Sequence, residues 1–252
     1  MSQYYQGKRT RNIFDPDAKS PFKLSRSKID LFLNCPRCFY IDRRLGVGQP
    51  PGYPFSLNSA VDTLLKKEFD YHRTKNSQHP LMKAYNIDAV PFNHEKMDEW
   101  RENFVGVQFL HEPSNFIVTG AVDDIWMGRD KRLIVVDYKA TSKDGQVNLD
   151  ADWQVGYKRQ MEVYQWLLRN NNHEVSDTGY FVYCNGRTDK EAFDGQLEFE
   201  VTVLPYTGDD SWIEDTLINA RKCLEAEKMP NPSLDCDYCT YRKAVSDAVK
   251  RV

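Results

Sequence analysis

Residues 120–139 read GAVDDIWMGRDKRLIVVDYK, two β-rich runs on either side of a turn-like GRDK segment. Such a pattern predicts a β-hairpin. Asp123 comes before the turn and Asp137 follows it, so the two residues should lie roughly opposite each other. Side chains alternate between the faces of a strand, which puts Asp137 and Lys139 on one face. The hairpin is therefore predicted to bring two carboxylates and one amine to a single patch.

These groups have a clear chemical use. Two aspartates and a backbone carbonyl, here that of Tyr138, are the hard oxygen ligands that Mg²⁺ or Mn²⁺ prefers. A metal held there would polarise a phosphodiester and lower the pKa of a bound water. A lysine beside it could position that water and offset the charge on the phosphate. Asp-x-Lys is also a common tripeptide, so an Asp-Asp pair that only caps a turn remains open at this point.

Composition places the chain in a broad class. It has 252 residues, of which 40% are hydrophobic and 28% are charged, and this balance excludes global disorder. No apolar run is long enough to span a membrane. The first residues show no secretory signal, so a cytoplasmic location is expected. The formal net charge of −3 neither indicates nor excludes a nucleic-acid partner.

Hydrophobic periodicity predicts one α/β domain around a mixed sheet. Residues 1–20 are polar and without periodicity, and we expect a flexible lead-in there. Residues 21–252 are expected to form a single domain. Besides the hairpin, the predicted elements are helices over 57–72, 151–170 and 211–228 and strands over 178–185 and 196–205.

The combination of motifs resembles the PD-(D/E)XK nuclease superfamily, and within it the RecB-type branch that includes the CRISPR-adaptation nucleases. GAVDDI resembles the Gly-x-x-Asp strand of that branch and VVDYK its Asp-x-Lys strand. The resemblance implies a restriction-endonuclease-like mixed sheet flanked by helices. It also implies that Asp123, Asp137 and the Tyr138 carbonyl are metal ligands and that Lys139 is the catalytic lysine.

A further motif of the branch, Gln-x-x-x-Tyr on a helix, matches Gln160 and Tyr164. Residues four apart share a helix face, and here that face is largely apolar. A buried glutamine is costly unless it is hydrogen-bonded, and a nearby active site could provide the partner. The resemblance therefore adds both residues to the predicted catalytic site. A satisfied core glutamine beside an ordinary aromatic residue is the alternative.

The sequence departs from the branch at an early helix, where a Gly-x-x-x-His pattern usually supplies another ligand. LNSAVDTLL aligns best and puts Asp62 at the histidine position and Asn58 at the glycine. A carboxylate can bind Mg²⁺, so Asp62 is expected to be a metal ligand. It could equally be a solvent-facing helix residue, and Glu68 is then the reserve candidate.

Four cysteines form two Cys-x-x-Cys pairs, Cys35 with Cys38 and Cys236 with Cys239. Each pair has metal-binding spacing, and in a reducing compartment metal binding is more common than disulfides. The pairs start 201 residues apart, so a joint site requires the fold to bring the N- and C-terminal pairs together. The resemblance implies a [4Fe–4S] cluster. Its usual pattern is one early and three late cysteines, so the two-plus-two arrangement leaves Zn²⁺ open.

Taken together, these features predict a Mg²⁺- or Mn²⁺-dependent deoxyribonuclease, an exonuclease acting on single-stranded DNA ends. Tyr40, Tyr157 and Tyr241 lie beside basic residues and are candidates for stacking on bases. One alternative is a catalytically impaired nucleic-acid-binding or structural subunit, which the missing histidine favours. Another is a processing subunit that is active only with partner proteins of a DNA-processing or CRISPR-type complex.

Overall fold

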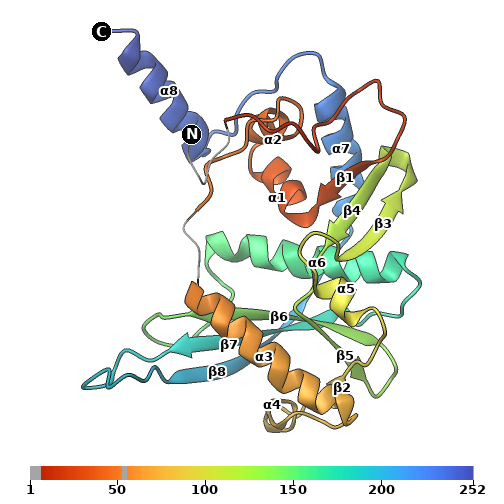
Figure 1. Cartoon of the computed structure of the whole chain (residues 1–252), viewed down its shortest axis with the longest axis vertical. Helices are drawn as coiled ribbons and strands as arrows, with labels where there is room; N and C mark the ends of the chain where they lie inside the picture. The colour runs from red at the N-terminus through yellow and green to blue at the C-terminus, as the bar shows by residue number, and fades with distance from the viewer. Residues whose placement is uncertain (1–6, 53–55, 252) are drawn as a thin grey trace. The chain divides into compact units, whose positions relative to one another are not determined.

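The computed structural model describes residues 7–52 and 56–251 (Figure 1). By its internal contacts the chain divides into two compact units. Unit 1 contains the N-terminal part up to residue 53 together with 110–118 and 211–252, and unit 2 contains 54–109 and 119–210. Among the described residues, no helix has both the length and the apolar character needed to cross a lipid bilayer.

Unit 2 is built on a five-stranded mixed sheet, as predicted. Strand β6 pairs in parallel with β7, and the other neighbours are antiparallel. A parallel pair needs a crossover connection, and helix α6 (Val155–Asn170), preceded by a single 3-10 turn (Asp152–Gln154), provides it. The strands, in spatial order, are β2 (Ala89–Pro91), β5 (Asp124–Gly128), β6 (Leu133–Thr141), β7 (Thr178–Gly186) and β8 (Phe199–Thr207).

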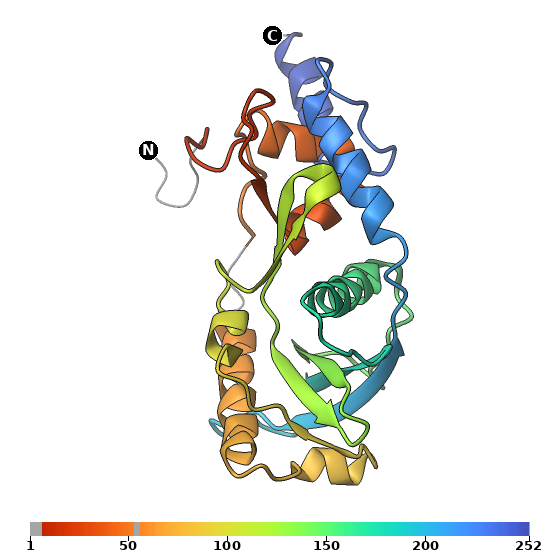
Figure 2. The ribbon, with the colours of Figure 1, turned by 90° about the vertical axis from the view of Figure 1, so that its right-hand side faces the viewer.

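Two helices cover the two faces of this sheet (Figure 2). Helix α3 (Ser56–Thr74) lies on one face, where Leu65 and Phe69 join a buried core with Tyr138 and Val182. Helix α6 lies on the other, facing the alternate residues of β6. The helix predicted over 57–72 is thus confirmed as α3. Two short helices, α4 (Pro80–Ala84) and α5 (Met97–Arg101), complete the unit.

The predicted hairpin is confirmed in its register. Asp124 pairs with Val136 and Met127 with Leu133, so Asp123 comes opposite Asp137 when the register is extended by one residue. The turn closes through the Gly128 amide, which donates to the Arg132 carbonyl over 3.0 Å.

The residues that lead into the hairpin turn, 116–128, form two strands. Strand β4 (Phe116–Gly120) ends before β5 begins, because the Val122 amide donates out of the ladder to the Trp100 carbonyl over 3.0 Å. Close packing also explains why residue 120 is a glycine. A Cβ at this position would lie 2.6 Å from Cε1 of Tyr164, so only glycine allows α6 to approach so closely.

Within the described residues, unit 1 contains four helices, and a small sheet is formed by residues 22–25, 107–111 and 116–120. The three-stranded sheet has the order β1 (Phe22–Ser25), β4 and β3 (Val107–His111), and a 3-10 turn (Glu112–Ser114) joins β3 to β4. Helix α7 (Ile213–Glu225) contacts both early helices, and the Tyr40 hydroxyl donates to the Ala226 carbonyl just beyond its end over 3.1 Å. The remaining helices are α1 (Arg26–Asn34), α2 (Pro36–Arg43) and α8 (Asp237–Val249).

Proline explains the break between the first two helices. Cys35 is extended, as expected for a residue before proline, and α1 ends at Asn34. Pro36 then opens α2, because its fixed φ and missing N–H suit the first helical position. Within residues 7–20, Phe14 is buried and the Arg9 amide donates to the Gly46 carbonyl over 2.8 Å.

Candidate active site and cysteine cluster

Asp137 and Lys139 lie on β6, and Asp123, one residue before β5, comes opposite Asp137 in the extended register of the two strands. One carboxylate oxygen of Asp123, Oδ2, accepts a hydrogen bond from the Tyr138 amide over 2.9 Å. Asp137 is fully buried and forms an ion pair with Lys139. The Asp123 side chain keeps 23% of its surface exposed, so this end of the cluster is open to a ligand.

Lys139 is held from two sides. Its ammonium pairs with Asp137 and lies 4.5 Å from the centroid of the Tyr157 ring. Tyr157 is on α6, and a cation over an aromatic face is attracted by the ring quadrupole. The arrangement therefore fixes the position of the amine at the α6 face of the sheet. It also explains how Lys139 can be largely covered, with 14% of its side chain exposed.

The glutamine motif reaches the same site. Gln160 Nε2 donates to Asp137 Oδ1 over 2.8 Å and to the Tyr164 hydroxyl over 3.0 Å. Both residues of the motif are buried. The amide thus orients the carboxylate of Asp137, and the phenol in turn contacts the amide. The buried amide is thus hydrogen-bonded, and one of its partners is an acidic residue of the predicted site.

Asp62 is linked to Asp123 by Lys66, which lies one turn further along α3. Lys66 Nζ lies 2.9 Å from Asp62 Oδ2 and 3.7 Å from Asp123 Oδ1. Burial raises the pKa of Asp62 and the charge of Asp123 adds to this, while Lys66 only partly offsets both. The reserve candidate Glu68 accepts instead from His79 Nε2 at 2.9 Å. Lys66 was missed by the sequence analysis, although its i,i+4 spacing from Asp62 was a signal.

Asp124 has a different role from its neighbour. Its carboxylate is completely buried, pairs with Arg73 and Arg101, and accepts from the Tyr138 hydroxyl over 2.7 Å. Burial and the charge of Asp124 raise the pKa of Tyr138 well above its ordinary value, so the phenol stays a donor. Arg101 Nε also donates to the Asp123 carbonyl over 3.0 Å. This buried network therefore anchors the backbone that carries Asp123.

The donor chemistry of the acidic residues fits a hard divalent cation, because every available ligand atom is a carboxylate or carbonyl oxygen. Asp62, Asp123 and Asp137 do not lie as close to one another as the ligands of a preformed metal site. In the part of the chain that the structure describes, the one group of three or more His, Cys, Asp or Glu residues placed to hold a metal ion consists of four cysteines, whose ligand atoms all lie within 4.8 Å of one another. The ammonium groups of Lys66 and Lys139 contact the aspartates instead.

The four cysteines of this group, Cys35, Cys38, Cys236 and Cys239, are those predicted to bind a metal, and all of them lie in unit 1. Cys38 Sγ lies 3.6 Å from both Cys236 Sγ and Cys239 Sγ, and Cys35 Sγ lies 3.8 Å from Cys239 Sγ. None of the four forms a disulfide. The prediction that the N- and C-terminal pairs come together is confirmed, and the four sulfurs can bind a metal ion or a cluster.

The position of each pair on its helix suits thiolate ligands. Cys35 and Cys236 are the N-cap residues of α2 and α8. Burial raises the pKa of the Cys35 thiol, but hydrogen bonds from backbone amides and neighbouring thiols outweigh it and lower the pKa to about 7. Burial and the neighbouring sulfurs raise the pKa of Cys38.

The remaining cysteines and stacking candidates are distributed as follows. Cys184 is buried in the unit 2 core, and Cys223 is half-buried on α7, in line with ordinary packing. Tyr40 is buried with its hydroxyl bonded, so it is not available to stack on a base. Tyr241 is 70% exposed.

Comparison with known families agrees with this geometry. A family model described as the PD-(D/E)XK nuclease superfamily matches residues 56–244, about three quarters of the chain. The chain belongs to the PD-(D/E)XK nuclease superfamily. The matched range contains the three aspartates, Lys139, the glutamine motif and the later cysteine pair. Membership implies a nuclease that hydrolyses phosphodiesters with the help of divalent metal ions.

A search of solved structures found a crystal structure described as that of SSO0001. It is similar over 90% of this PD-(D/E)XK chain and 86% of the other chain, with 16% sequence identity and a TM-score of 0.42. The comparison with curated proteins gave no match.

Proposed function

We propose that this PD-(D/E)XK protein is a Mg²⁺- or Mn²⁺-dependent deoxyribonuclease of the RecB-type branch. The observation that carries the proposal is the ion pair of Asp137 with Lys139, with Gln160 donating to Asp137. Asp123 accepts from the amide of Tyr138, the residue between them. Asp62 and the carbonyl of Tyr138 complete the proposed ligand set.

The residues divide the chemistry between them. Hydrolysis adds water to the phosphorus and breaks one P–O bond, which leaves a phosphomonoester and an alcohol. When bound, the divalent ion polarises the phosphodiester and lowers the pKa of a bound water. Lys139 offsets the charge that develops on the phosphoryl oxygens and positions the water. Gln160 and Tyr164 keep the Asp137 carboxylate oriented, so it need not reorganise during the reaction.

Single-stranded DNA ends are the proposed substrate, and the proposed mode is exonucleolytic. Membership of the superfamily supports a nucleic-acid substrate, while the RecB-type motifs support DNA ends. Partner proteins of a DNA-processing or CRISPR-type complex are proposed on the same resemblance. We also propose that residues 21–252 work as one nuclease-like domain, because the matched range 56–244 includes sequence from both compact units.

For the four cysteines we propose a [4Fe–4S] cluster, with Zn²⁺ as the alternative. Both suit four thiolates. Anaerobically purified protein with absorbance near 400 nm would support the cluster. A colourless sample with stoichiometric zinc would reject it.

A second candidate function is a catalytically impaired DNA-binding subunit. The observation that favours it is Lys66, whose ammonium contacts both Asp62 and Asp123 where a further metal ligand is expected. An amine in this position competes with a cation for the two carboxylates.

A cleavage assay separates the two. End-labelled single- and double-stranded DNA is incubated with the protein in Mn²⁺, in Mg²⁺ and in EDTA. The nuclease proposal predicts metal-dependent loss of label from single strands, absent in EDTA and in Lys139→Ala. Equal degradation by wild type and Lys139→Ala would reject the catalytic assignment. DNA binding without cleavage in either metal would favour the impaired subunit.

A further inference from the structure

A pocket of about 420 Å³ opens in unit 2 at the carboxyl end of β6, immediately beyond Lys139. It is lined by residues from α3, β6, α6 and the β7–β8 segment. Among these are Leu57, Thr141, Ser142, Tyr157, Leu197 and Phe199. Its volume falls within the range of small-ligand pockets, roughly 300–1,000 Å³.

The pocket adjoins the proposed catalytic site through Tyr157. Tyr157 lines the pocket and also carries the Lys139 ammonium 4.5 Å from its ring centroid. Thr141 is two residues beyond Lys139 on the same strand, which is about 7 Å at the usual rise of roughly 3.3 Å per residue. If the phosphate of a ligand lies at Lys139, the next chemical group along that ligand can therefore reach this pocket.

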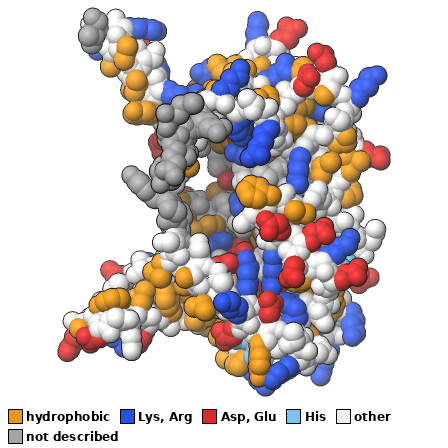
Figure 3. Space-filling model, in the orientation of Figure 1, with side chains coloured by type: hydrophobic (Ala, Val, Ile, Leu, Met, Phe, Trp, Pro, Cys, Tyr) orange, Lys and Arg blue, Asp and Glu red, His pale blue; other side chains and the backbone are white. Residues whose placement is uncertain are grey.

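The walls suit a flat, apolar ring. Leu57 and Leu197 line the pocket and are 55% and 38% exposed as whole residues, and Phe199 adds an aromatic ring to this lining. Hydrophobic side chains gather on the surface at this end of unit 2 (Figure 3). Large exposed apolar patches mark interaction sites or ligand-binding grooves. The Thr141 hydroxyl lies among these walls and can hydrogen-bond to a polar ring edge. The Ser142 hydroxyl already donates to the Gly186 carbonyl over 3.1 Å and can only accept.

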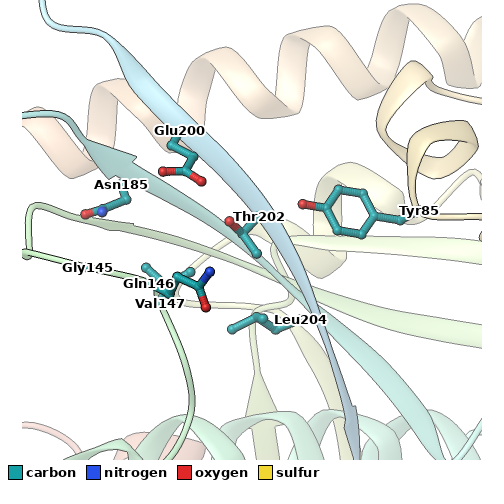
Figure 4. A pocket seen from close by; sticks show the side chains of 8 residues that line it. All are labelled: Tyr85, Gly145, Gln146, Val147, Asn185, Glu200, Thr202 and Leu204. Carbon is teal, nitrogen blue, oxygen red and sulfur yellow. The ribbon is translucent and has the colours of Figure 1, made fainter.

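A second cavity of about 300 Å³ in the same unit differs in character (Figure 4). Tyr85, Gln146, Glu200 and Thr202 surround it, and none of the proposed catalytic residues lines it. The Glu200 carboxylate would repel a phosphate backbone. The pocket next to Lys139 is therefore the better match to a nucleotide chain.

We propose that the pocket walled by Leu57, Tyr157 and Phe199 receives one unpaired nucleobase of the strand whose phosphate is held at Lys139. The inference rests on the proposed nuclease function and deepens it. A base can turn into a pocket only when it is neither paired nor stacked in a duplex, so the pocket selects single-stranded substrate. Stacking on an aromatic ring tolerates every base, so little sequence preference is expected.

The test measures binding separately from cleavage. Single-stranded oligonucleotides, each with an abasic site at a different position, are titrated against the full chain in EDTA and, separately, in Ca²⁺, and fluorescence anisotropy gives the affinity. Phe199→Leu keeps apolar bulk in the core but removes the ring, and Phe199→Tyr restores it. Phe104→Leu serves as control, because Phe104 is 86% exposed and does not line the pocket.

For wild type we expect one abasic position to weaken binding by about 5-fold or more, as losing one stacked base costs roughly 1–3 kcal/mol. Phe199→Leu should weaken binding to intact DNA and lose most of the sensitivity to that abasic position. Phe199→Tyr and Phe104→Leu should behave like wild type.

Other results overturn the inference. If wild type cleaves and binds DNA but no single abasic position matters, or if Phe199→Leu keeps full sensitivity to it, the pocket does not hold a base while the nuclease proposal stands. If wild type neither binds nor cleaves DNA, both proposals fail together. The circular dichroism spectra of Phe199→Leu and wild type should be the same. Such agreement shows that the variant is folded, so a difference in DNA binding reports on the missing ring.

Discussion

The carboxylates of Asp123 and Asp124 are adjacent in the chain but have opposite surroundings. Asp124 is fully buried between two guanidinium groups and the Tyr138 hydroxyl. Asp123 stays partly exposed and reaches the Tyr138 amide and Lys66. The residue Tyr138 thus contacts one aspartate with its backbone and the other with its side chain. One carboxylate holds the hairpin in place and the other is available to a ligand.

Replacing the two aspartates separately should give contrasting effects. Asp124→Asn leaves Arg73 and Arg101 without their buried counter-charge, and breaking such a group costs about 3–5 kcal/mol in the free energy of unfolding. Asp123→Asn should change that free energy little but lower the cleavage rate by about 100-fold or more, because it removes a proposed ligand. Urea unfolding and a Mn²⁺-dependent cleavage assay measure the two quantities. Equal loss of stability in both variants would contradict the division of roles.

Asp62→Asn should raise stability in metal-free protein while weakening metal binding. Burial, helped by the charge of Asp123, raises the pKa of folded Asp62 above its ordinary value of 3.8. The wild type therefore loses stability relative to the variant as pH rises from 3.8 to the raised folded value, and the difference is constant above it. Unfolding measurements in EDTA at several pH values test whether wild type is less stable than Asp62→Asn.

Calorimetric titration with Mn²⁺ checks the other half of this prediction. A variant that binds Mn²⁺ as tightly as wild type would show that Asp62 is an ordinary helix residue and no ligand.

The glutamine motif should act through Asp137. Gln160→Glu replaces a donor with a second carboxylate beside a buried one, so it should lower cleavage by about 100-fold or more. Tyr164→Phe removes only a hydroxyl that contacts the amide, and its effect should be smaller. Rates under saturating Mn²⁺ give the comparison. Full activity of Gln160→Glu would show that the contact with Asp137 has no part in the reaction.

Loss of one cluster cysteine should release the bound metal or cluster. Cys38→Ser removes the sulfur that lies 3.6 Å from both members of the later pair. We expect iron or zinc content to fall well below one site per chain and the thermal unfolding midpoint to drop. Cys223→Ala is the matched control, because Cys223 lies in the same unit but outside the four-sulfur group. Wild-type metal content in Cys38→Ser would exclude this site.

Local patterns predicted the parts of the fold that depend on neighbouring residues. The hairpin followed from strand alternation and a turn, and α3 from apolar spacing, because both signals lie within about twenty residues. Helix α2 was not among the predicted helices, because Cys35-Pro36 resembles the end of a helix, although proline also opens helices. Helix α8 carries one buried residue, Cys239, so its periodicity gave little signal.

The electrostatic partners of the site were harder to predict. Arg73 and Arg101 precede Asp124 by 51 and 23 residues, and no local pattern links residues so far apart. The cysteine pairs could be joined only because both carried a recognisable spacing. Long-range ion pairs between single residues carry no such signature, so the buried network behind Asp123 required the folded chain.

The most direct test of the proposed site is an anomalous difference map from crystals of the wild-type protein soaked in Mn²⁺. We predict a manganese peak within about 2.5 Å of carboxylate oxygens of both Asp123 and Asp137, close to the Tyr138 carbonyl. The same soak of Asp123→Asn should lose the peak. A wild-type map with no manganese between these two aspartates, while cleavage still depends on Mn²⁺, would contradict the assignment of this cluster as the catalytic centre.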